Sequence, residues 1–210
     1  MKAVITIDGV NYTAEDTISL AMAQWPMLPG RPGLNDAVSM LRMMGSKVIT
    51  SPKCVVGIDN GVSGALVILA ASNGDLLAKA HMPSRKRGGK NEIDSVALAD
   101  WLRENLEELH LHDFVLERPV GSQSVNAAVS MHGSYHAIRS TIEVLGGNFH
   151  DVSAKEWQKA MLRKGDTKEQ SIFTAVTRWP NEDWRKSDRA KKPYPDFCDA
   201  ANIAEYYRTR

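Results

Sequence analysis

Hydrophobic residues are most concentrated in three short segments near the middle of the chain. The segments CVVGID at 54–59, ALVILAA at 65–71 and LLAKAHM at 76–82 are separated by short polar turns that contain glycine. Apolar runs of this length between turn residues are typical of β-strands, and such short connections join strands that run antiparallel. The pattern therefore predicts three neighbouring antiparallel strands.

Beyond these strands the apolar residues change to helical spacing, interrupted by two more strand-like segments. DFVLE at 113–117 and the segment at 148–152 have the length and composition of strands. A strand that follows a helical crossover runs parallel to the strand it joins, so both are expected to be parallel to the first strand. The order predicts an α/β fold, a mixed five-stranded sheet with helices on its faces. Helices are expected at 93–109, 125–145, 153–162, 167–179 and 196–207.

Residues 1–52 have a different pattern and form a predicted accessory module with the order ββαα, ahead of a main domain at 53–210. Asn35 is the expected N-cap of its second helix, because an Asn side chain satisfies free backbone N–H groups there. The expected elements are a hairpin at 2–12 that turns at Asp8 and Gly9, helices at 14–25 and 36–44, and a linker at 50–53.

Composition limits the class of protein. The chain has 210 residues, of which 43% are hydrophobic and 24% charged, as in an ordinary globular protein. No apolar run approaches the roughly 20 residues that a membrane helix needs, and the first residues lack the apolar core of a signal peptide. We therefore expect a protein without a membrane partner, in the cytoplasm of a bacterium or of a phage-infected host cell.

Cysteine and histidine do not predict a metal site. Cys54 and Cys198 are the only cysteines, and their separation fits neither a zinc knuckle nor a disulfide framework. We interpret both as small buried hydrophobic residues. His132 and His136 lie four residues apart in a predicted helix but have no evident third ligand of their kind, so packing and hydrogen bonding explain them better.

Basic residues gather in two runs although the formal net charge of the chain is only +1. Clusters of Lys and Arg neutralise phosphates, which makes both runs candidate nucleic-acid contacts; the alternative is two solvated loops. With Arg118, which follows the strand at 113–117, the candidate DNA-binding residues are Arg85, Lys86, Arg87, Lys90, Arg118, Arg185, Lys186, Arg189, Lys191 and Lys192.

Four acidic residues lie at the ends of predicted elements. Asp59 and Glu117 each end a strand, and Asp196 and Asp199 open the last helix, where a spacing of three puts them on one face. Ligand sites in open α/β sheets favour the carboxyl ends of the strands. Carboxylates that meet there repel one another unless cations lie between them, and Mg²⁺ prefers such oxygen ligands. The pattern indicates phosphodiester chemistry.

Four segments, taken in order, resemble the successive motifs of the RuvC-type Holliday junction resolvases. They are GIDNGVSGALVI from Gly57, FVLERP from Phe114, KEQ at 168–170 and DFCDAANIAEYY from Asp196. The segment GDTKEQS, the following RWP and the final IAEYY are closest to the phage, poxvirus and chloroplast members. The resemblance covers about residues 54–207 and implies an RNase H-like nuclease fold.

The resemblance implies a Mg²⁺-dependent endonuclease with two ions in each active site, for which Mn²⁺ is an acceptable substitute. Asp59 matches the aspartate of the first strand and is expected to bridge the ions. Glu117 and Asp199 are expected to hold one ion each, and Asp196 to support or share. Lys168 matches a basic residue that stabilises a phosphate or positions the water. The implied partners are four-way junction DNA and a second copy of the chain, because a C2 dimer matches the symmetry of a junction.

The chain departs from the family at several positions. Asn60 stands where many relatives have proline, and Gln158 stands where relatives have lysine. The segment RPVGSQSVN after Glu117 lacks the aromatic residue that helps bacterial members to open a junction. Residues 1–52 match no part of the family.

Other functions fit parts of the pattern. GIDNGVSGAL also resembles the phosphate loop of actin-like ATPases, but such proteins need a second large domain, for which this chain is too short. A non-catalytic junction-binding protein and an RNase H-like nuclease that cuts flaps or forks stay open. The N-terminal helices, with Arg31, Arg42 and Lys47, are either a DNA-binding module or a packed appendage whose hydrophobic residues cover the main domain.

Overall fold

The computed structural model describes residues 5–8, 10–12, 14–25, 30–46, 48–49, 53–107, 109–119, 121, 124–163 and 167–210. The chain divides into two compact units. The larger one comprises residues 53–105 and 109–210, and the smaller one comprises residues 1–52 together with the short segment 106–108.

The larger unit is built on a five-stranded sheet with the strand order β10-β9-β4-β5-β6. β5 is antiparallel to both β4 and β6, whereas β9 runs parallel to β4 and β10 parallel to β9. The predicted mixed sheet is confirmed, including the direction of every strand. The strands are β4 (Cys54–Asp59), β5 (Ala65–Ala70), β6 (Leu76–His81), β9 (Asp113–Glu117) and β10 (Asn148–Val152).

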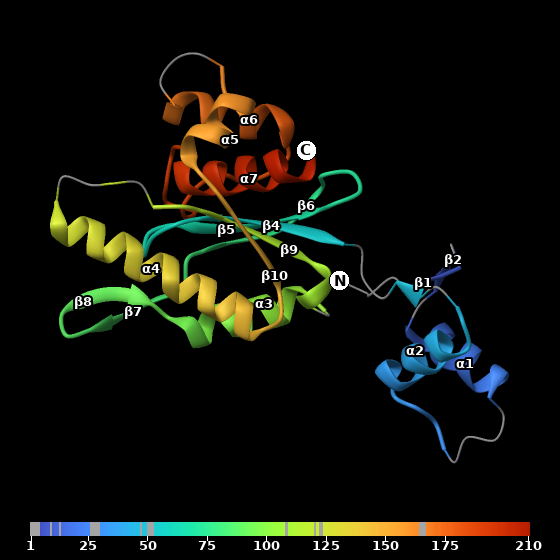
Figure 1. The fold of residues 1–210 in the computed structure, drawn as a ribbon. Helices are drawn as coiled ribbons and strands as arrows, with labels where there is room; N and C mark the ends of the chain where they lie inside the picture. Colours follow the sequence, from blue (N-terminus) through green and yellow to red (C-terminus); the bar gives the residue numbers. More distant parts are fainter. Residues whose placement is uncertain are drawn as a thin grey trace. The chain divides into compact units, whose positions relative to one another are not determined.

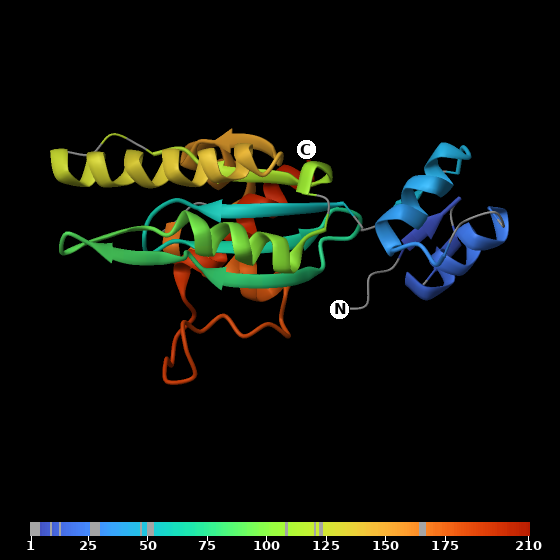
Figure 2. The ribbon, with the colours of Figure 1, turned by 90° about the horizontal axis from the view of Figure 1, so that it is seen from below.

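Helices cover both faces of this sheet, so the unit has three layers (Figure 1). α3 (Ser95–Asn105) and α4 (Val125–Val144) lie on one face. α7 (Pro195–Arg208) packs against β4 and β5 on the other face, where α5 (Ala154–Met161) and α6 (Thr167–Arg178) lie over it. Figure 2 shows the same two helical layers from below, with α4 alongside the sheet. A single 3₁₀ turn, Leu109–Leu111, leads into β9.

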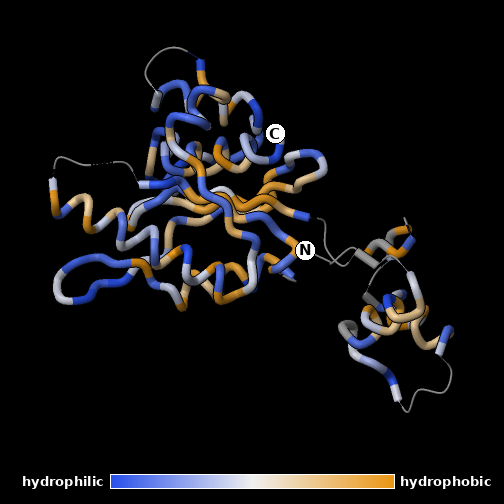
Figure 3. Tube along the Cα trace, in the orientation of Figure 1, coloured by the Kyte–Doolittle hydropathy of each residue, from blue (hydrophilic) through white to orange (hydrophobic). Residues whose placement is uncertain are grey.

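The central strands form the core because they are apolar on both faces (Figure 3). Every residue of β5 is buried, as are the first five residues of β4. α7 packs unusually close to β4 because its facing residues are small, among them Ala200 and Ala204. A Cβ atom added at Gly57 would lie only 2.0 Å from the carbonyl oxygen of Ala200. Glycine at this position therefore allows the close contact between strand and helix.

The first basic run forms a hairpin and is not a loop. β7 (Ser84–Arg87) and β8 (Lys90–Ile93) pair antiparallel, with Arg87 opposite Lys90. The two connecting residues, Gly88 and Gly89, have φ values of 56° and 79°, which a two-residue type I′ turn requires and glycine adopts readily. The prediction of a helix from position 93 was wrong at its start, because β8 includes Ile93 and α3 begins at Ser95.

The smaller unit contains a sheet with the order β2-β1-β3 and two helices. Its described core includes Ile5, Val38 and Leu41, all at most 2% exposed. The predicted ββαα order is confirmed, but the third strand was not expected. The elements are β1 (Ile5–Ile7), β2 (Val10–Tyr12), α1 (Ala14–Gln24), α2 (Leu34–Met43) and β3 (Val48–Ile49).

The start of α2 differs from the prediction. Asn35 is not its N-cap, because Gly33 occupies that position and the helix already begins at Leu34. Trp25 and Met44 are 42% and 46% exposed within the structure. Arg31 forms an ion pair with Glu15. The predictions at Gly9, Lys47 and 50–52 lie outside the described residues. None of the described helices is long and apolar enough to cross a membrane.

Candidate active site

Asp59 and Glu117 end adjacent parallel strands. Ile58 of β4 lies opposite Leu116 of β9, so the next residue on each strand is one of the two acids. Both carboxylates are partly buried. The paired strands thus bring side chains 58 positions apart in sequence to one edge of the sheet, as expected for a ligand site in an open α/β sheet.

α7 supplies the other two acids from its first turns. The helix begins at Pro195, whose fixed φ and missing N–H suit a first helical position. Asp196 and Asp199 follow at a spacing of three residues and are both partly buried. Because α7 crosses β4 in direct contact at Gly57, its first turns reach the end of the strand where Asp59 lies.

The four carboxyl groups share one electrostatic environment. The pKa of Asp59 is raised well above its ordinary value, first by burial and then by the negative charges of Asp199, Glu117 and Asp196, in that order. Burial likewise raises the pKa of Glu117, and the charge of Asp199 adds to the effect. Such mutual destabilisation of the charged forms is the expected result of carboxylates gathered without a counter-ion.

Hydrogen-bond donors from two helices engage the outer carboxylates. The indole Nε1–H of Trp157, in α5, donates to Oε2 of Glu117 at 2.6 Å. The hydroxyl of Ser171, in α6, donates to Oδ1 of Asp199. Burial raises the pKa of Asp199 to about 6, although the bond from Ser171 and the charge of Lys168 act in the opposite direction.

The four carboxylates are chemically suitable ligands for divalent cations, because their oxygens are hard donors. Within the part of the chain that the structure describes, however, no three His, Cys, Asp or Glu side chains converge as a metal-binding group. Two physical reasons account for the separation of the four carboxylates. Like charges repel when no cation lies between them, and donors hold one oxygen each of Glu117 and Asp199. The donor set therefore fits the predicted Mg²⁺ ions, whereas the tight convergence predicted from sequence is absent.

Lys168 lies in the first turn of α6, on the side of the helix that approaches Asp199. Its side chain is exposed, and its positive charge lowers the pKa of Asp199. The predicted basic residue is thus placed next to the acids, and it is accessible to a phosphate.

Sequence reasoning missed Tyr194 as a neighbour of the acids. Its hydroxyl donates to the carbonyl oxygen of Ser63 at 2.5 Å. Burial raises its pKa, and a hydrogen bond with Asp196 together with the charge of Asp59 adds to this. Trp157 and Ser171 were missed too. The one sequence signal that bears on Trp157 is the capping pair of Ser153 and Glu156. It sets where α5 begins, and therefore which way the side chain of Trp157 points.

The basic residues of the β7–β8 hairpin are exposed, but two of them are paired. Arg85 forms an ion pair with Glu92 at 2.9 Å, and Arg87 lies 3.9 Å from the same carboxylate. Lys86 and Lys90 are exposed on the hairpin. A groove of about 920 Å³ separates the hairpin from α4, and Arg85, Arg87 and Lys90 line its hairpin side.

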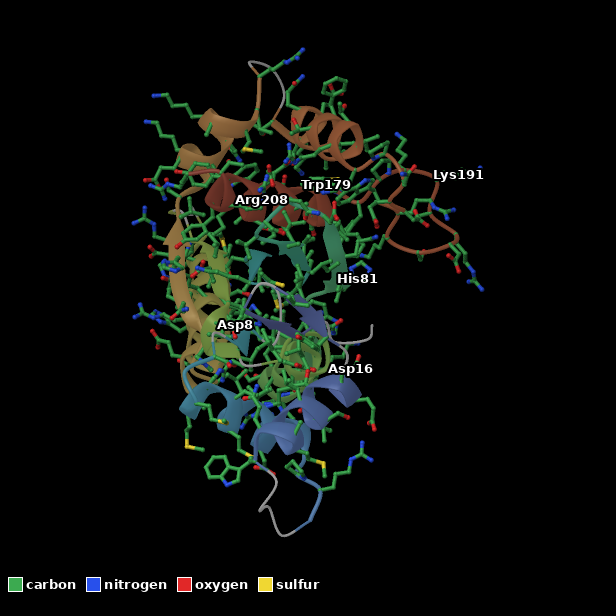
Figure 4. The ribbon with its side chains drawn as sticks, turned by 90° about the vertical axis from the view of Figure 1, so that its right-hand side faces the viewer. Asp8, Asp16, His81, Trp179, Lys191 and Arg208 are labelled. Atoms are coloured by element: carbon green, nitrogen blue, oxygen red, sulfur yellow. The ribbon has the colours of Figure 1, made fainter. Side chains whose placement is uncertain are left out.

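The second basic run lies on an exposed loop before α7. Arg185 pairs with Asp183 at 2.6 Å, and Lys186 lies over the ring of Tyr194, 4.9 Å from its centroid. Figure 4 shows Lys191 on the part of this loop that projects from the helical layer. Arg189, Lys191 and Lys192 are all exposed.

Arg118 lies between two acids of the main domain. Its guanidinium lies 3.3 Å from the carboxylate of Glu156 and 3.8 Å from that of Asp151. Its charge is thus paired with acids at the protein surface, which weakens its candidacy as a DNA contact.

The structure places the two cysteines in the core and the two histidines of α4 on the surface. Neither Cys54 nor Cys198 forms a disulfide, and both are buried, as predicted. Burial raises the pKa of their thiols, to about 11 and about 12 respectively. His132 and His136 are exposed, and the His136 ring packs edge-on against Tyr135.

The fold, but not the sequence, resembles known proteins. No protein-family model matches the chain, and no curated protein matches it. RuvC of Thermus thermophilus in complex with a Holliday junction substrate is similar over 75% of this chain and 95% of its own, at a TM-score of 0.54 and 14% identity. A second structure of Thermus thermophilus RuvC covers 74% and 95% at a TM-score of 0.51 and 15% identity.

A poxvirus protein is also similar. The fowlpox virus resolvase, in complex with Holliday junction DNA, covers 74% of this chain and 97% of its own at 18% identity, with a TM-score of 0.46. The resemblance to the phage, poxvirus and chloroplast members stays a prediction from sequence. The likeness to Thermus RuvC shows that the chain shares the fold of these structures, and the fold class predicted from sequence is confirmed.

Proposed function

We propose that the chain is a metal-dependent endonuclease that resolves four-way DNA junctions. The observation that carries this proposal is that Asp59 and Glu117 end two adjacent parallel strands, and that the charges of Glu117, Asp196 and Asp199 all raise the pKa of Asp59. The likeness in fold to an enzyme that was crystallised with a Holliday junction substrate supports the choice of DNA substrate.

Each residue has a role that follows from its place. Asp59, Glu117 and Asp199 would hold the Mg²⁺ ions, and Asp196 would support them. The chemistry that bound Mg²⁺ supplies is activation of a water molecule and stabilisation of the leaving oxygen. Lys168 would contact the scissile phosphate, since its charge reaches Asp199 and its side chain is exposed.

The two basic runs would bind the arms of the junction through phosphates, which favours branch shape over sequence. Lys86 and Lys90 on the hairpin and Arg189, Lys191 and Lys192 on the loop before α7 are the best candidates, because they are exposed, whereas Arg85, Arg87 and Arg185 form ion pairs with acids of the protein. Arg118 contributes little in this scheme, since it pairs with acids of the protein itself.

A homodimer would complete the enzyme by presenting two active sites to a junction of near-twofold symmetry. α4 is the candidate interface. Val125, Val129 and Val144 are 77%, 66% and 86% exposed on this helix, an unusual amount of aliphatic surface for one element.

The test is cleavage of synthetic four-way, three-way and linear duplex DNA in the presence of Mg²⁺. We expect paired symmetric nicks in the four-way substrate alone. Asp59→Asn and Glu117→Gln are expected to reduce cutting by at least about 100-fold while junction binding persists, because each removes a metal ligand but no phosphate contact. Full cutting by either variant would overturn the assignment of the site, and junction binding without cutting by the wild-type chain would indicate a non-catalytic junction-binding protein.

A further inference from the structure

The loop that leads into the acids of α7 carries unpaired cations. Residues 185–193 contain five basic residues and one acidic residue, a local net charge of +4 in a chain whose formal net charge is +1. Arg189, Lys191 and Lys192 are exposed and form no ion pair with any residue that the structure describes. Figure 4 shows Lys191 on the projecting part of the loop. These three cations are therefore available to an external polyanion.

The two ends of this loop are held together. Arg185 and Pro193 form an isolated β-bridge, and the backbone N–H of Tyr194 donates to the carbonyl oxygen of Trp184 at 2.6 Å. Asp183 accepts three hydrogen bonds from Arg185, one from its backbone N–H and two from its guanidinium. The side chain of Trp184 is 3% exposed, so the base of the loop is anchored in the core. The loop is thus a closed segment on a fixed base.

The base of the loop also contacts the elements that carry the acids. Tyr194 lies two residues before Asp196, and its hydroxyl donates to the carbonyl oxygen of Ser63 in the turn that follows β4. Lys186 lies over the ring of Tyr194. The carbonyl oxygen of Lys186 is 2.9 Å from Nε2 of His81, at the end of β6. The position of the loop is therefore set relative to the acids.

The length of chain between the exposed lysines and the acids limits their separation. Each residue of an extended chain spans at most about 3.6 Å. The Cα atom of Lys192 therefore lies at most about 14 Å from that of Asp196, and the Cα atom of Lys191 at most about 18 Å. One strand of a DNA duplex has a phosphate about every 3.4 Å along its axis. Phosphates that reach these lysines while the acids hold the cut site therefore lie within about five nucleotides of the cut.

Negative charge at the acids opposes the approach of a DNA backbone. The four carboxylates repel a phosphate, most strongly when no cation lies between them. Exposed lysines a short length of chain away attract neighbouring phosphates and offset part of this repulsion. The loop thus supplies binding where the acids by themselves weaken it.

We propose that Lys191 and Lys192 bind phosphates of the junction arm that is cut, within about five nucleotides of the scissile phosphate, and that the closed loop fixes the position of the cut relative to the branch point. The inference rests on the proposed function, since it takes junction DNA as the substrate. It gives the two basic runs different tasks. The β7–β8 hairpin lies beside α4, in the other helical layer, so Lys86 and Lys90 bind phosphates elsewhere on the junction.

The experiment first maps the cut that the full chain makes in a synthetic four-way junction with Mg²⁺. Uncharged methylphosphonate linkages then replace the phosphates of the cut arm one at a time, and binding is measured in a chelator. At one or more positions within about five nucleotides of the cut, the replacement is expected to weaken wild-type binding roughly threefold, as for loss of one exposed ion pair. Lys191→Ala combined with Lys192→Ala is expected to abolish this loss, because the partner of the phosphate is already missing.

Lys86→Ala combined with Lys90→Ala is the matched control, because it removes the same charge from the hairpin. This variant is expected to retain the wild-type losses near the cut. If both double variants abolish the losses, a general reduction of positive charge explains them and the inference is overturned. Losses near the cut that persist in the variant of Lys191 and Lys192 overturn it as well.

The position of the cut is a second readout. Asp183→Ala removes three hydrogen bonds from the base of the loop but keeps every cation of the loop. We expect this variant to bind the junction at least as tightly as wild type and to cut at several neighbouring phosphates. A single unchanged cut position contradicts the proposal that the closed loop fixes the cut.

The two proposals fail in different ways. A wild-type chain that cuts four-way junctions but shows no loss of binding from methylphosphonates near the cut refutes the inference and leaves the proposed function intact. A wild-type chain that does not cut junctions refutes the proposed function, and the inference with it.

Discussion

At Asp59, the negative charge that the proposed chemistry needs opposes the stability of the fold. The carboxyl group of this residue is partly buried, and its pKa is raised by burial and by the negative charges of Asp199, Glu117 and Asp196, so its charged form is destabilised in the fold. Such a group stores instability in the folded protein that a bound cation relieves. Catalytic sites commonly have this property, because the charge needed for chemistry opposes folding.

At the residue scale, stability of the metal-free protein is expected to rise as pH falls from 7 to 5. Asp199 has a folded pKa of about 6, above its ordinary value of 3.8, so the folded state binds protons that the unfolded state has already released. Stability then decreases with pH across this window. Thermal unfolding in a chelator at pH 5, 6 and 7 measures the effect, expected to be on the order of 1 kcal/mol or a few degrees.

Asp199→Asn is the control for this pH dependence. It removes the titrating group, so its melting temperature is expected to change less with pH than that of the wild type. Saturating Mg²⁺ is expected to raise the melting temperature more at pH 7 than at pH 5, because protons compete with the ion. A wild-type protein that loses stability between pH 7 and pH 5 as fast as the variant contradicts the prediction.

At the element scale, the contact between β4 and α7 decides whether the acids meet. A Cβ at Gly57 would lie 2.0 Å from the oxygen of Ala200 and 2.6 Å from the nitrogen of Ala204. Both are backbone atoms, which cannot rotate away. We therefore expect Gly57→Ala to push α7 from the sheet and to reduce unfolding free energy by roughly 3 kcal/mol, measured by urea denaturation, with loss of junction cutting.

Gly133→Ala is the matched control for Gly57. Gly133 lies inside α4, and a Cβ there would meet no atom within 4 Å. Alanine has a higher helix propensity than glycine by about 1 kcal/mol, so this variant is expected to be slightly more stable than wild type. Equal effects of the two substitutions would mean that the close approach of α7 is unimportant.

The β7–β8 hairpin makes a second prediction at this scale. Lys86 and Lys90 are exposed, whereas Arg85 and Arg87 lie close to Glu92. Lys86→Ala combined with Lys90→Ala is expected to weaken junction binding roughly tenfold and to reduce its salt dependence by nearly two counter-ions. Binding at several salt concentrations measures both effects. A slope equal to that of wild type would exclude the hairpin lysines as phosphate contacts.

At the scale of the whole molecule, the proposed function requires that two chains assemble. Val129 is 66% exposed on α4, a position where an isolated protein would favour a polar residue. If α4 forms the dimer interface, Val129→Glu introduces charge into it and is expected to yield monomers, which sedimentation equilibrium measures. Cutting is then expected to change from paired nicks to single nicks. A variant that remains a dimer would exclude this face.

The sequence alone determined the order and direction of the main strands, the two acids that end strands and the two acids that open the last helix. Apolar runs such as CVVGID can only be stable when buried, and a terminal carboxylate after such a run must lie at a sheet edge. Local signals were also reliable where one residue satisfies another nearby, as Ser153 and Glu156 do at the start of α5. These features follow from interactions that span a few residues or from strand geometry.

Only the tertiary structure decided which donors hold the acids. Trp157 bonds to Glu117 across 40 residues, and Ser171 to Asp199 across 28. Neither pair has a spacing that marks it in sequence, because its members belong to different elements that packing brings together. The separation of the four carboxylates and the short distance between β4 and α7 at Gly57 likewise depend on how separate elements pack. Sequence patterns report which face of an element is buried, whereas these distances arise only when the elements pack.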